Sequence, residues 1–370
     1  MLRENVFTVM LARLARVPFA LFRQRPFTPP TKALILHPCC LSQVLLSTPL
    51  LAALSEAYPR GRFDWAVSDW ARPAIAGNPR LTELVSTGPG RLHDLSWREL
   101  NAFIAQLRAE KYDTCFIPSR STLLAYVAWR AGIPQRVGLN IDGRGFAHTL
   151  AVRLPPEGAH DTAVALLLAA AAGVDPAVIQ SASTEFYPPD RDRTAVTQRL
   201  VEEIDWLGDV PLVVMHPGGG SNPVATDARK QWPVERFARL GNHLARRHGA
   251  RVALVGSEAD RPLAAAIGGL MAVKATNLAG QMGLGELGAL CEVADLYVGN
   301  DAGPTHVAAA TGCPTLAIYG PSNPAVSGPH APQGKVRALW RPFEGEFSWS
   351  VGVTVAEAIA AAAELLRRAG

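Results

Sequence analysis

Short apolar segments that fit buried strands alternate with longer segments of helical spacing from Lys32 onward. In the first half of the chain the helix candidates are residues 43–59, 96–111 and 122–132, and the strand candidates are residues 32–37, 62–67, 81–87, 112–118 and 135–140. Strands that alternate with helices are typical of βαβ units, which build a parallel sheet with helices on its faces. The pattern therefore predicts an α/β protein.

A Pro-rich, charged stretch at residues 184–193 interrupts this alternation, and we interpret it as a linker. Beyond it come a helix candidate at 233–249, a closing helix at 354–370 and strand candidates at 210–217, 251–257, 275–280, 294–300 and 314–320. A chain of 370 residues is too long for one ordinary core. We therefore predict two doubly wound domains, residues 31–183 and 194–370, with a cleft between the carboxyl edges of their strands.

The composition of the chain limits the classes of function that are open to it. Hydrophobic residues make up 48% of the chain and charged residues 18%, which is typical of a globular protein. The formal net charge of +4 suits an anionic ligand or membrane surface, but no zinc-finger spacing, RNA-recognition motif or long Lys/Arg run indicates nucleic acid. The five Cys are an odd number, and Cys39 and Cys40 are adjacent, so we expect free thiols in a reducing cytoplasm. No metal-ligand spacing is present, and the oligomeric state cannot be inferred.

Residues 1–30 differ from the rest because apolar residues there are mixed with Arg13, Arg16, Arg23 and Arg25. No apolar run approaches the roughly 20 residues that span a bilayer. One interpretation is a basic amphipathic extension that lies on an anionic leaflet, and the other is a loosely packed N-terminal helix.

The stretch GNDAGPTHVAAATG at residues 299–312 joins a strand candidate to a helix of small residues. Pro304 suits the first helical position, where its missing N–H costs nothing. His306 in the first turn could donate to a phosphate oxygen. We therefore predict an anion site at the start of this helix, where the helix dipole and the free N–H groups of Ala302, Gly303 and Thr305 would bind the anion.

Other residues that follow predicted strands also fit an anionic ligand that carries a sugar. Asp301 could accept from a sugar hydroxyl or cap the helix. Gly218 and Gly219 begin a Gly-rich loop of the kind that lets the backbone approach a ligand. Lys230 could neutralise charge on a leaving diphosphate, and Glu258 could grip ribose hydroxyls. A capped helix, a flexible loop and a helix-end acid are the structural alternatives.

Long segments of the chain resemble glycosyltransferase family 9, the lipopolysaccharide heptosyltransferases. They are HPGGG…ARKQWPVERFARL, LVGSEAD, LLSTPLLAALSEAYPRGRFDW and the long block LAGQMGLGELGALCEVADLYVGNDAGPTHVAAATGCPTLAIYGPSNP. The resemblance implies a GT-B fold, two Rossmann-like domains facing a central cleft. It also implies metal-independent, inverting transfer of a heptose from ADP-heptose to a lipid-linked core sugar, without a cofactor.

The resemblance assigns roles by position. Lys230 faces the diphosphate, Glu258 binds ribose, Met282 lines the adenine pocket and Asp301 orients the donor. The diphosphate cradle corresponds to Ala302, Gly303 and His306, with Ala302 where many relatives carry Ser or Thr, and the acceptor loop to Ser119 and Arg120.

The chain departs from the family at its first loop, where HPCCLSQVLLSTP places Gln43 at the position of the expected catalytic Asp. Gln cannot take a proton near neutral pH. Another group could serve as the base, with His37 nearest in sequence and Asp64 and Asp69 further away. The acceptor could instead need less activation, or the protein could bind the nucleotide sugar without turnover.

Two functions therefore stay open. The first is a heptosyltransferase-like enzyme on the cytoplasmic face of the inner membrane, with a nucleotide-sugar donor and a glycolipid acceptor. The second is a non-catalytic GT-B protein. A sugar epimerase on a similar scaffold is a weaker third alternative, because residues 299–321 fit the glycosyltransferase pattern.

Overall fold

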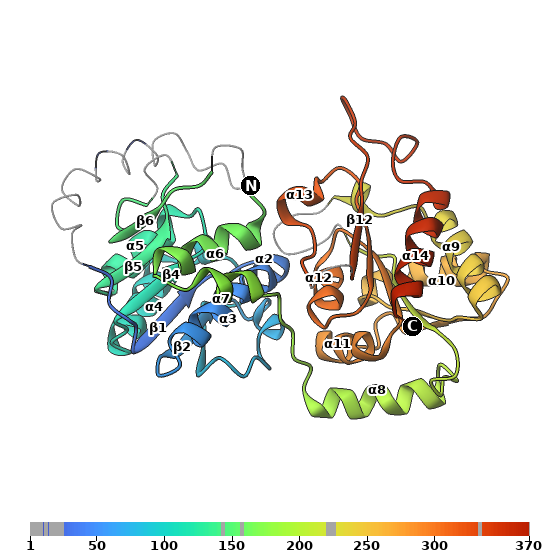
Figure 1. The fold of residues 1–370 in the computed structure, drawn as a ribbon, viewed down its shortest axis with the longest axis horizontal. Helices are drawn as coiled ribbons and strands as arrows, with labels where there is room; N and C mark the ends of the chain where they lie inside the picture. The colour runs from blue at the N-terminus through green and yellow to red at the C-terminus, as the bar shows by residue number, and fades with distance from the viewer. Residues whose placement is uncertain are drawn as a thin grey trace. The chain divides into compact units, whose positions relative to one another are not determined.

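The computed structural model describes Met10, Leu14 and residues 26–141, 145–155, 159–219, 227–331 and 335–369, with side chains as far as Arg367. The chain divides into two compact units (Figure 1). The first contains the described residues up to Arg72 and residues 78–182, and the second contains residues 73–77 and 183–370. The predicted N-terminal extension lies almost wholly outside the described residues.

The first unit is a six-stranded parallel sheet in the order β3-β2-β1-β4-β5-β6. Its strands are β1 (Lys32–Leu36), β2 (Arg62–Val67), β3 (Glu83–Ser86), β4 (Thr114–Ile117), β5 (Gln135–Leu139) and β6 (Leu150–Val152). Its helices are α2 (Leu41–Leu46), α3 (Thr48–Ala57), α4 (Trp97–Ala109), α5 (Thr122–Arg130), α6 (Asp161–Ala171) and α7 (Pro176–Ser181).

The predicted helix 43–59 is wrong in one respect, because it is two helices. Ser47 ends α2 and begins α3. Pro49 is the second residue of α3, where its missing N–H breaks no helical hydrogen bond. In one continuous helix the same Pro would lie in the interior and disrupt the backbone ladder.

The second unit is also a six-stranded parallel sheet, in the order β12-β11-β10-β7-β8-β9. Its strands are β7 (Leu212–His216), β8 (Arg251–Leu254), β9 (Ala275–Asn277), β10 (Leu296–Asn300), β11 (Thr315–Ile318) and β12 (Val336–Leu339). Its helices are α8 (Asp190–Glu202), α9 (Val234–His248), α10 (Arg261–Leu270), α11 (Leu284–Val293), α12 (Gly303–Ala310), α13 (Pro324–Ser327) and α14 (Val355–Ala369). The last four residues of the predicted linker 184–193 form the first turn of α8.

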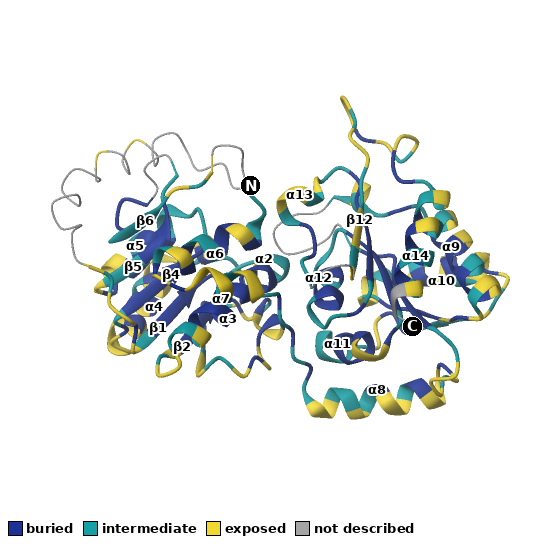
Figure 2. Ribbon diagram, in the orientation of Figure 1, coloured by how far each residue is buried: buried dark blue, intermediate teal, exposed yellow. Residues whose placement is uncertain are grey.

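Apolar cores fill both faces of this second sheet. On one face the strands pack against α9, α10 and α14, and on the other against α8, α11 and α12. Because both faces are covered, β7, β10 and β11 are buried along their whole length, as the dark blue of Figure 2 shows. This explains why the sequence shows them as continuous apolar runs.

Both sheets have the doubly wound order. The chain adds strands first toward one edge of the sheet and then, from a central strand, toward the other edge. The reversal falls between β1 and β4 in the first unit and between β7 and β10 in the second. The loops after these strands diverge to opposite faces, and open α/β sheets bind ligands at the crevice this leaves. The topology thus directs attention to residues after His216 and Asn300, and to those after Leu36 and Ile117.

Candidate functional site

Lys230 and Asp301 meet at the carboxyl edge of the second sheet, although 71 positions separate them in sequence. The Lys230 ammonium lies 2.6 Å from Asp301 Oδ2, and the same oxygen accepts a hydrogen bond of 2.7 Å from the Ser322 hydroxyl. The Lys230 side chain keeps 30% of its surface exposed, so an incoming anion can reach it. Ser322 was not among the predicted residues, and no sequence motif singles it out.

Asn300 has a structural role in this arrangement. It is fully buried, and its amide donates to the carbonyls of Pro217 and Gly218 at 2.8 and 2.9 Å. Its carbonyl oxygen accepts from the backbone N–H of Trp232 at 3.1 Å. Asn300 therefore ties the end of β10 to the loop after β7 and to the segment that carries Lys230.

Helix α12 begins at this edge without a side-chain cap. Its N-cap residue is Ala302, so the suggestion that Asp301 caps the helix is wrong. Pro304 is the second residue of α12, one position later than predicted but still within the first turn. The N–H of Thr305 donates to the carbonyl of Ala302 at 3.1 Å, so the expectation that this N–H is free is wrong. The dipole of α12 still points its positive end at this site, and His306 is buried in its first turn.

The Gly-rich loop passes close to the same helix end. A side chain at Gly219 would bring its Cβ to 3.0 Å from the Ala302 Cβ, and the backbone there is left-handed, with φ of 112°. At Gly218 a Cβ would lie 2.3 Å from the Asp260 carboxyl group. Glycine is required at both positions for different reasons, one conformational and one steric. The third glycine of the run lies outside the described residues.

Glu258 and Met282 lie further along the same edge. Glu258 follows β8 in a short 3₁₀ turn, and its side chain is 70% exposed and forms an ion pair with Arg261 at 3.1 Å. A Cβ at Gly280 would lie 2.0 Å from Glu258 Oε2, so the loop after β9 runs against this carboxylate. Met282 is half-buried and packs on the core of the α8–α11 face.

The end of β7 carries a buried histidine that the sequence did not single out. His216 Nε2 lies 3.9 Å from Asp260 Oδ2. Burial lowers the pKa of His216 to about 4, and the charge of Asp260 opposes this only in part. Asp260 in turn accepts from the backbone N–H and the hydroxyl of Ser257. His216 is thus neutral at pH 7 and does not add positive charge to the site.

In the first unit, His37 and Gln43 follow β1. The His37 ring is buried, and its Nδ1 lies 3.0 Å from Ser47 Oγ. The Ser47 hydroxyl donates its one hydrogen to the carbonyl of Gln43 at 2.9 Å. His37 Nδ1 must therefore be the donor to Ser47, which leaves a lone pair on Nε2. Burial lowers the pKa of His37 to about 4, and the Gln43 side chain is exposed.

Cys39 and Cys40 are joined by a disulfide in the same loop. The expectation that all five cysteines are thiols is therefore wrong for this pair. The other three, Cys115, Cys291 and Cys313, are free and buried as expected. The pair directly precedes α2, with Cys40 as its N-cap residue.

Ser119 and Arg120 follow β4, on the other side of the reversal point, and both are half-buried. Arg120 lies near Asp161, the first residue of α6, where its positive charge opposes the rise in the pKa of Asp161 that burial causes. The sequence did not predict α6, so Asp161 was missed. A short acid-led helix start at His160-Asp161 is the one signal that could have found it.

Of the two more distant candidates for a base, Asp64 is enclosed in the core. It is buried in β2 and accepts a hydrogen bond of 2.9 Å from the Tyr112 hydroxyl. Asp69 is exposed beyond the end of β2 and accepts from Ser86 at 2.7 Å. Asp64 is thus out of reach of a substrate.

The described residues contain neither a metal-ligand cluster nor a membrane-spanning helix. No three His, Cys, Asp or Glu side chains among them are grouped as metal ligands would be. None of their helices is both long and apolar enough to cross a bilayer.

Comparison with known proteins gives a consistent result. The family described as glycosyltransferase family 9 (heptosyltransferase) matches residues 100–343. Lipopolysaccharide heptosyltransferase 2 of Escherichia coli is 27% identical over 318 residues, which cover 83% of this chain and 88% of that protein.

Solved structures share the fold. A family 9 glycosyltransferase from Veillonella parvula superposes with a TM-score of 0.78 at 22% identity, covering 91% of this chain and 97% of that one. The ADP-heptose lipopolysaccharide heptosyltransferase II of Escherichia coli gives a TM-score of 0.71 at 22% identity, covering 91% and 99%. The α/β, GT-B fold implied by the resemblance is confirmed.

Proposed function

Since the chain belongs to glycosyltransferase family 9, we propose that it moves a heptose or a related sugar from an ADP-sugar to a lipid-linked or other glycan acceptor, with inversion. The similarity to lipopolysaccharide heptosyltransferase 2 and to an ADP-heptose heptosyltransferase supports this donor and acceptor class. The observation that carries the proposal is the Lys230–Asp301 pair beside the uncapped start of α12.

The donor diphosphate is proposed to lie at this helix end. There the dipole of α12, the backbone of Ala302 and Gly303 and the Lys230 ammonium would stabilise its negative charge. Asp301 holds the Lys230 ammonium at 2.6 Å, so a diphosphate would compete with that carboxylate for it. As the sugar–phosphate bond breaks, charge grows on the leaving ADP, and a fixed cation is worth more then than in the ground state.

The nucleoside is proposed to extend along the carboxyl edge toward β9. Glu258 is exposed and can accept from both ribose hydroxyls once it is released from Arg261. Met282 would contribute an apolar surface to the adenine ring, His306 would support the diphosphate from within α12, and Gly218 and Gly219 keep the approach open. No metal is required in this scheme, because Lys230 and the helix dipole supply the positive charge.

A thermal-shift panel with ADP, UDP, GDP and ADP-heptose tests the donor half. A ligand at about 100 times its Kd adds roughly 2.7 kcal/mol to stability, which is readily measured. We expect a selective shift with the adenine nucleotides that is lost in Lys230→Met. Arg229→Met is the matched control, because this neighbouring cation is exposed and pairs only with Asp227 among the described residues. Equal shifts in the two variants would contradict the role of Lys230.

The acceptor half needs a base, and the hydrogen bonds around His37 support it in that role. The acceptor hydroxyl oxygen attacks the anomeric carbon, the bond to the diphosphate breaks with its electron pair on ADP, and the proton must go to a base. Ser47 orients the neutral His37 ring so that Nε2 keeps its lone pair. With a pKa of about 4, this nitrogen is as basic as an ordinary Asp carboxylate.

Transfer assays separate the alternatives for the base. General-base catalysis is typically worth about 10²–10⁴-fold, so His37→Asn should lose at least a hundredfold in kcat. Gln43→Asp should raise transfer if the missing carboxylate limits the rate. Asp161→Asn tests whether Asp161, the other titratable group near the acceptor loop, is the base. Unchanged kcat in His37→Asn together with a large loss in Asp161→Asn would move the base to Asp161.

A nucleotide-sugar-binding protein without turnover is the second candidate, and Gln43 is the observation that favours it. Release of ADP from ADP-heptose that depends on a cell-derived glycan acceptor would exclude this candidate. A thermal shift with ADP but no acceptor-dependent release in either wild type or Gln43→Asp would support it.

The acceptor is proposed to be reached from the cytoplasmic face of the inner membrane, with the basic residues 1–30 in contact with its anionic leaflet. Ser119 and Arg120 would bind the acceptor sugar. Equal binding to anionic liposomes after deletion of residues 1–30 would argue against the contact.

A further inference from the structure

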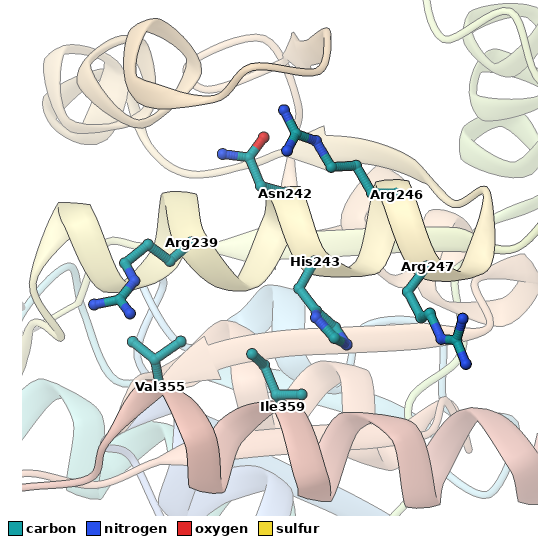
Figure 3. Close-up of a pocket in the computed structure, with 7 residues that line it drawn as sticks. All are labelled: Arg239, Asn242, His243, Arg246, Arg247, Val355 and Ile359. Carbon is teal, nitrogen blue, oxygen red and sulfur yellow. The ribbon is translucent and has the colours of Figure 1, made fainter.

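A groove of about 490 Å³ lies between α9 and α14 of the second unit, away from the strand edge that carries the donor residues. Figure 3 shows Arg239, His243 and Arg247 extending from α9 toward α14, where Val355 and Ile359 rise to meet them. The three α9 residues are four positions apart, so they share one helix face over about 12 Å. The groove therefore has a cationic wall and an apolar wall.

The positive charge of this groove is not neutralised within the described residues. Arg239 and Arg247 are exposed, and neither forms an ion pair or hydrogen bond there. The two acids of α14 are engaged elsewhere, Glu357 with Arg341 at 2.8 Å and Glu364 with Arg337 at 2.5 Å.

His248, next to Arg247 on α9, lies close to the cations of this groove. His248 stacks edge-on against His243, with ring centroids 6.2 Å apart. Its pKa is lowered by partial burial and then by the positive charges of His243, Arg247 and Arg367. Arg367, near the end of α14, does not line the groove, but its charge acts on the same imidazole as that of Arg247.

We propose that this groove docks the second unit on a membrane surface of anionic phospholipids. Lipid phosphates lie against Arg239 and Arg247, with the charge of Arg367 adding to the positive potential beside them, and the less polar part of the lipid lies against Val355 and Ile359. A single small anion contacts cations only at hydrogen-bond distance, whereas this row extends over about 12 Å. Several phosphates side by side, as in a leaflet, match the row, and the two apolar side chains suit a lipid better than a free anion. The choice of a lipid source rests on the proposed function, in which the acceptor is lipid-linked.

Vesicle co-sedimentation tests the proposal with the full chain. The probes are phosphatidylcholine vesicles with and without phosphatidylglycerol. Each Arg at an anionic surface contributes about fivefold to binding, so Arg239→Gln/Arg247→Gln/Arg367→Gln should bind the anionic vesicles on the order of a hundredfold more weakly than wild type.

A matched control removes the same charge from other surfaces. Arg60, Arg98 and Arg191 are exposed and lie outside the groove and the donor site, so Arg60→Gln/Arg98→Gln/Arg191→Gln should lose far less. Residues 1–30 are present in all three proteins, so any contact that they make affects each equally. Equal losses in the two triple variants would show that net charge alone is sensed and would overturn the docking site.

Two further measurements distinguish a lipid from a soluble anion, and the groove from the donor site. Stabilisation of the wild type, but not of the groove variant, by inorganic phosphate or glycerol phosphate would reassign the groove to a soluble anion and overturn the lipid proposal. The ADP thermal shift is expected to be unchanged in the groove variant. An absent ADP shift in every protein would reject the proposed function, whereas a normal shift with undiminished vesicle binding by the groove variant would reject only the groove.

Discussion

Two buried histidines should make this protein lose stability in mild acid, one in each unit. Burial lowers the pKa of His37, in the first unit, and of His216, in the second, from 6.5 to about 4. In the unfolded chain both titrate near 6.5. Between these values the unfolded state binds more protons than the folded state, so stability falls as the pH falls.

The size of the effect follows from the two pKa values. For one histidine shifted from 6.5 to about 4, lowering the pH from about 7 to about 5 removes about 2 kcal/mol from the unfolding free energy. The loss begins near pH 6.5 and levels off below pH 4, where both states are protonated. A typical folded protein has about 5–15 kcal/mol in total, so the change is a large share.

The variant His37→Asn removes this contribution while it keeps a donor to Ser47, because the Asn amide can replace the ring Nδ1–H. His216→Asn removes the corresponding histidine contribution from the second unit. We would measure urea dependence of hydrogen exchange at both pH values in peptides of β1 and β7, with intrinsic exchange rates corrected, so that the two units are measured separately.

Each substitution is expected to reduce the pH dependence of its own unit by about 2 kcal/mol and to leave the other unit unchanged. If β1 peptides of His37→Asn lose as much stability between the two pH values as wild type, then His37 is not held neutral by burial. Its assignment as a base with the strength of a carboxylate would then fail as well.

Three further predictions concern the donor site and the cysteines. Asp301→Asn should tighten ADP binding by about fivefold, because the Asp301 carboxylate no longer competes for the Lys230 ammonium, and it should lower transfer. Weaker ADP binding by calorimetry would contradict this competition. Gly219→Ala places a side chain at a φ of 112° and should cost about 1–2 kcal/mol of stability together with ADP affinity, and an unchanged melting temperature and Kd would refute the conformational requirement. Alkylation of the denatured protein should label three of its five cysteines before reduction and all five after it, whereas five labels in both cases would exclude the Cys39–Cys40 bond.

The inner strands could be predicted from sequence because their burial is imposed locally. Residues 62–67 were predicted as a strand and form β2 with those bounds, and the apolar runs of β7 and β10 are equally clear. The edge strands β6 and β12 were missed. They are half-buried or exposed along their length, so no apolar run marks them.

The polar residues at strand ends were identified by type, but their partners were not. Lys230 was expected to face the diphosphate and Asp301 to orient the donor, yet their contact depends on β7 and β10 being neighbours across the reversal of the sheet. Asn300 joins the loop after β7 to the segment of Lys230, a role that depends on the same neighbouring strands. The contact of Ser322 with Asp301 has no local signature at all.

The sequence by itself determined the α/β alternation, the family and the residue types at the strand ends, because apolar periodicity and motif spacing act over a few neighbouring residues. The tertiary structure alone decided which of these residues meet. It gave His37 a hydrogen-bonded orientation and a low pKa, and it placed arginines of α9 beside a groove against α14. Burial and charge depend on contacts between segments far apart in the chain, and such contacts exist only once the sheet order and the packing of its helices are set.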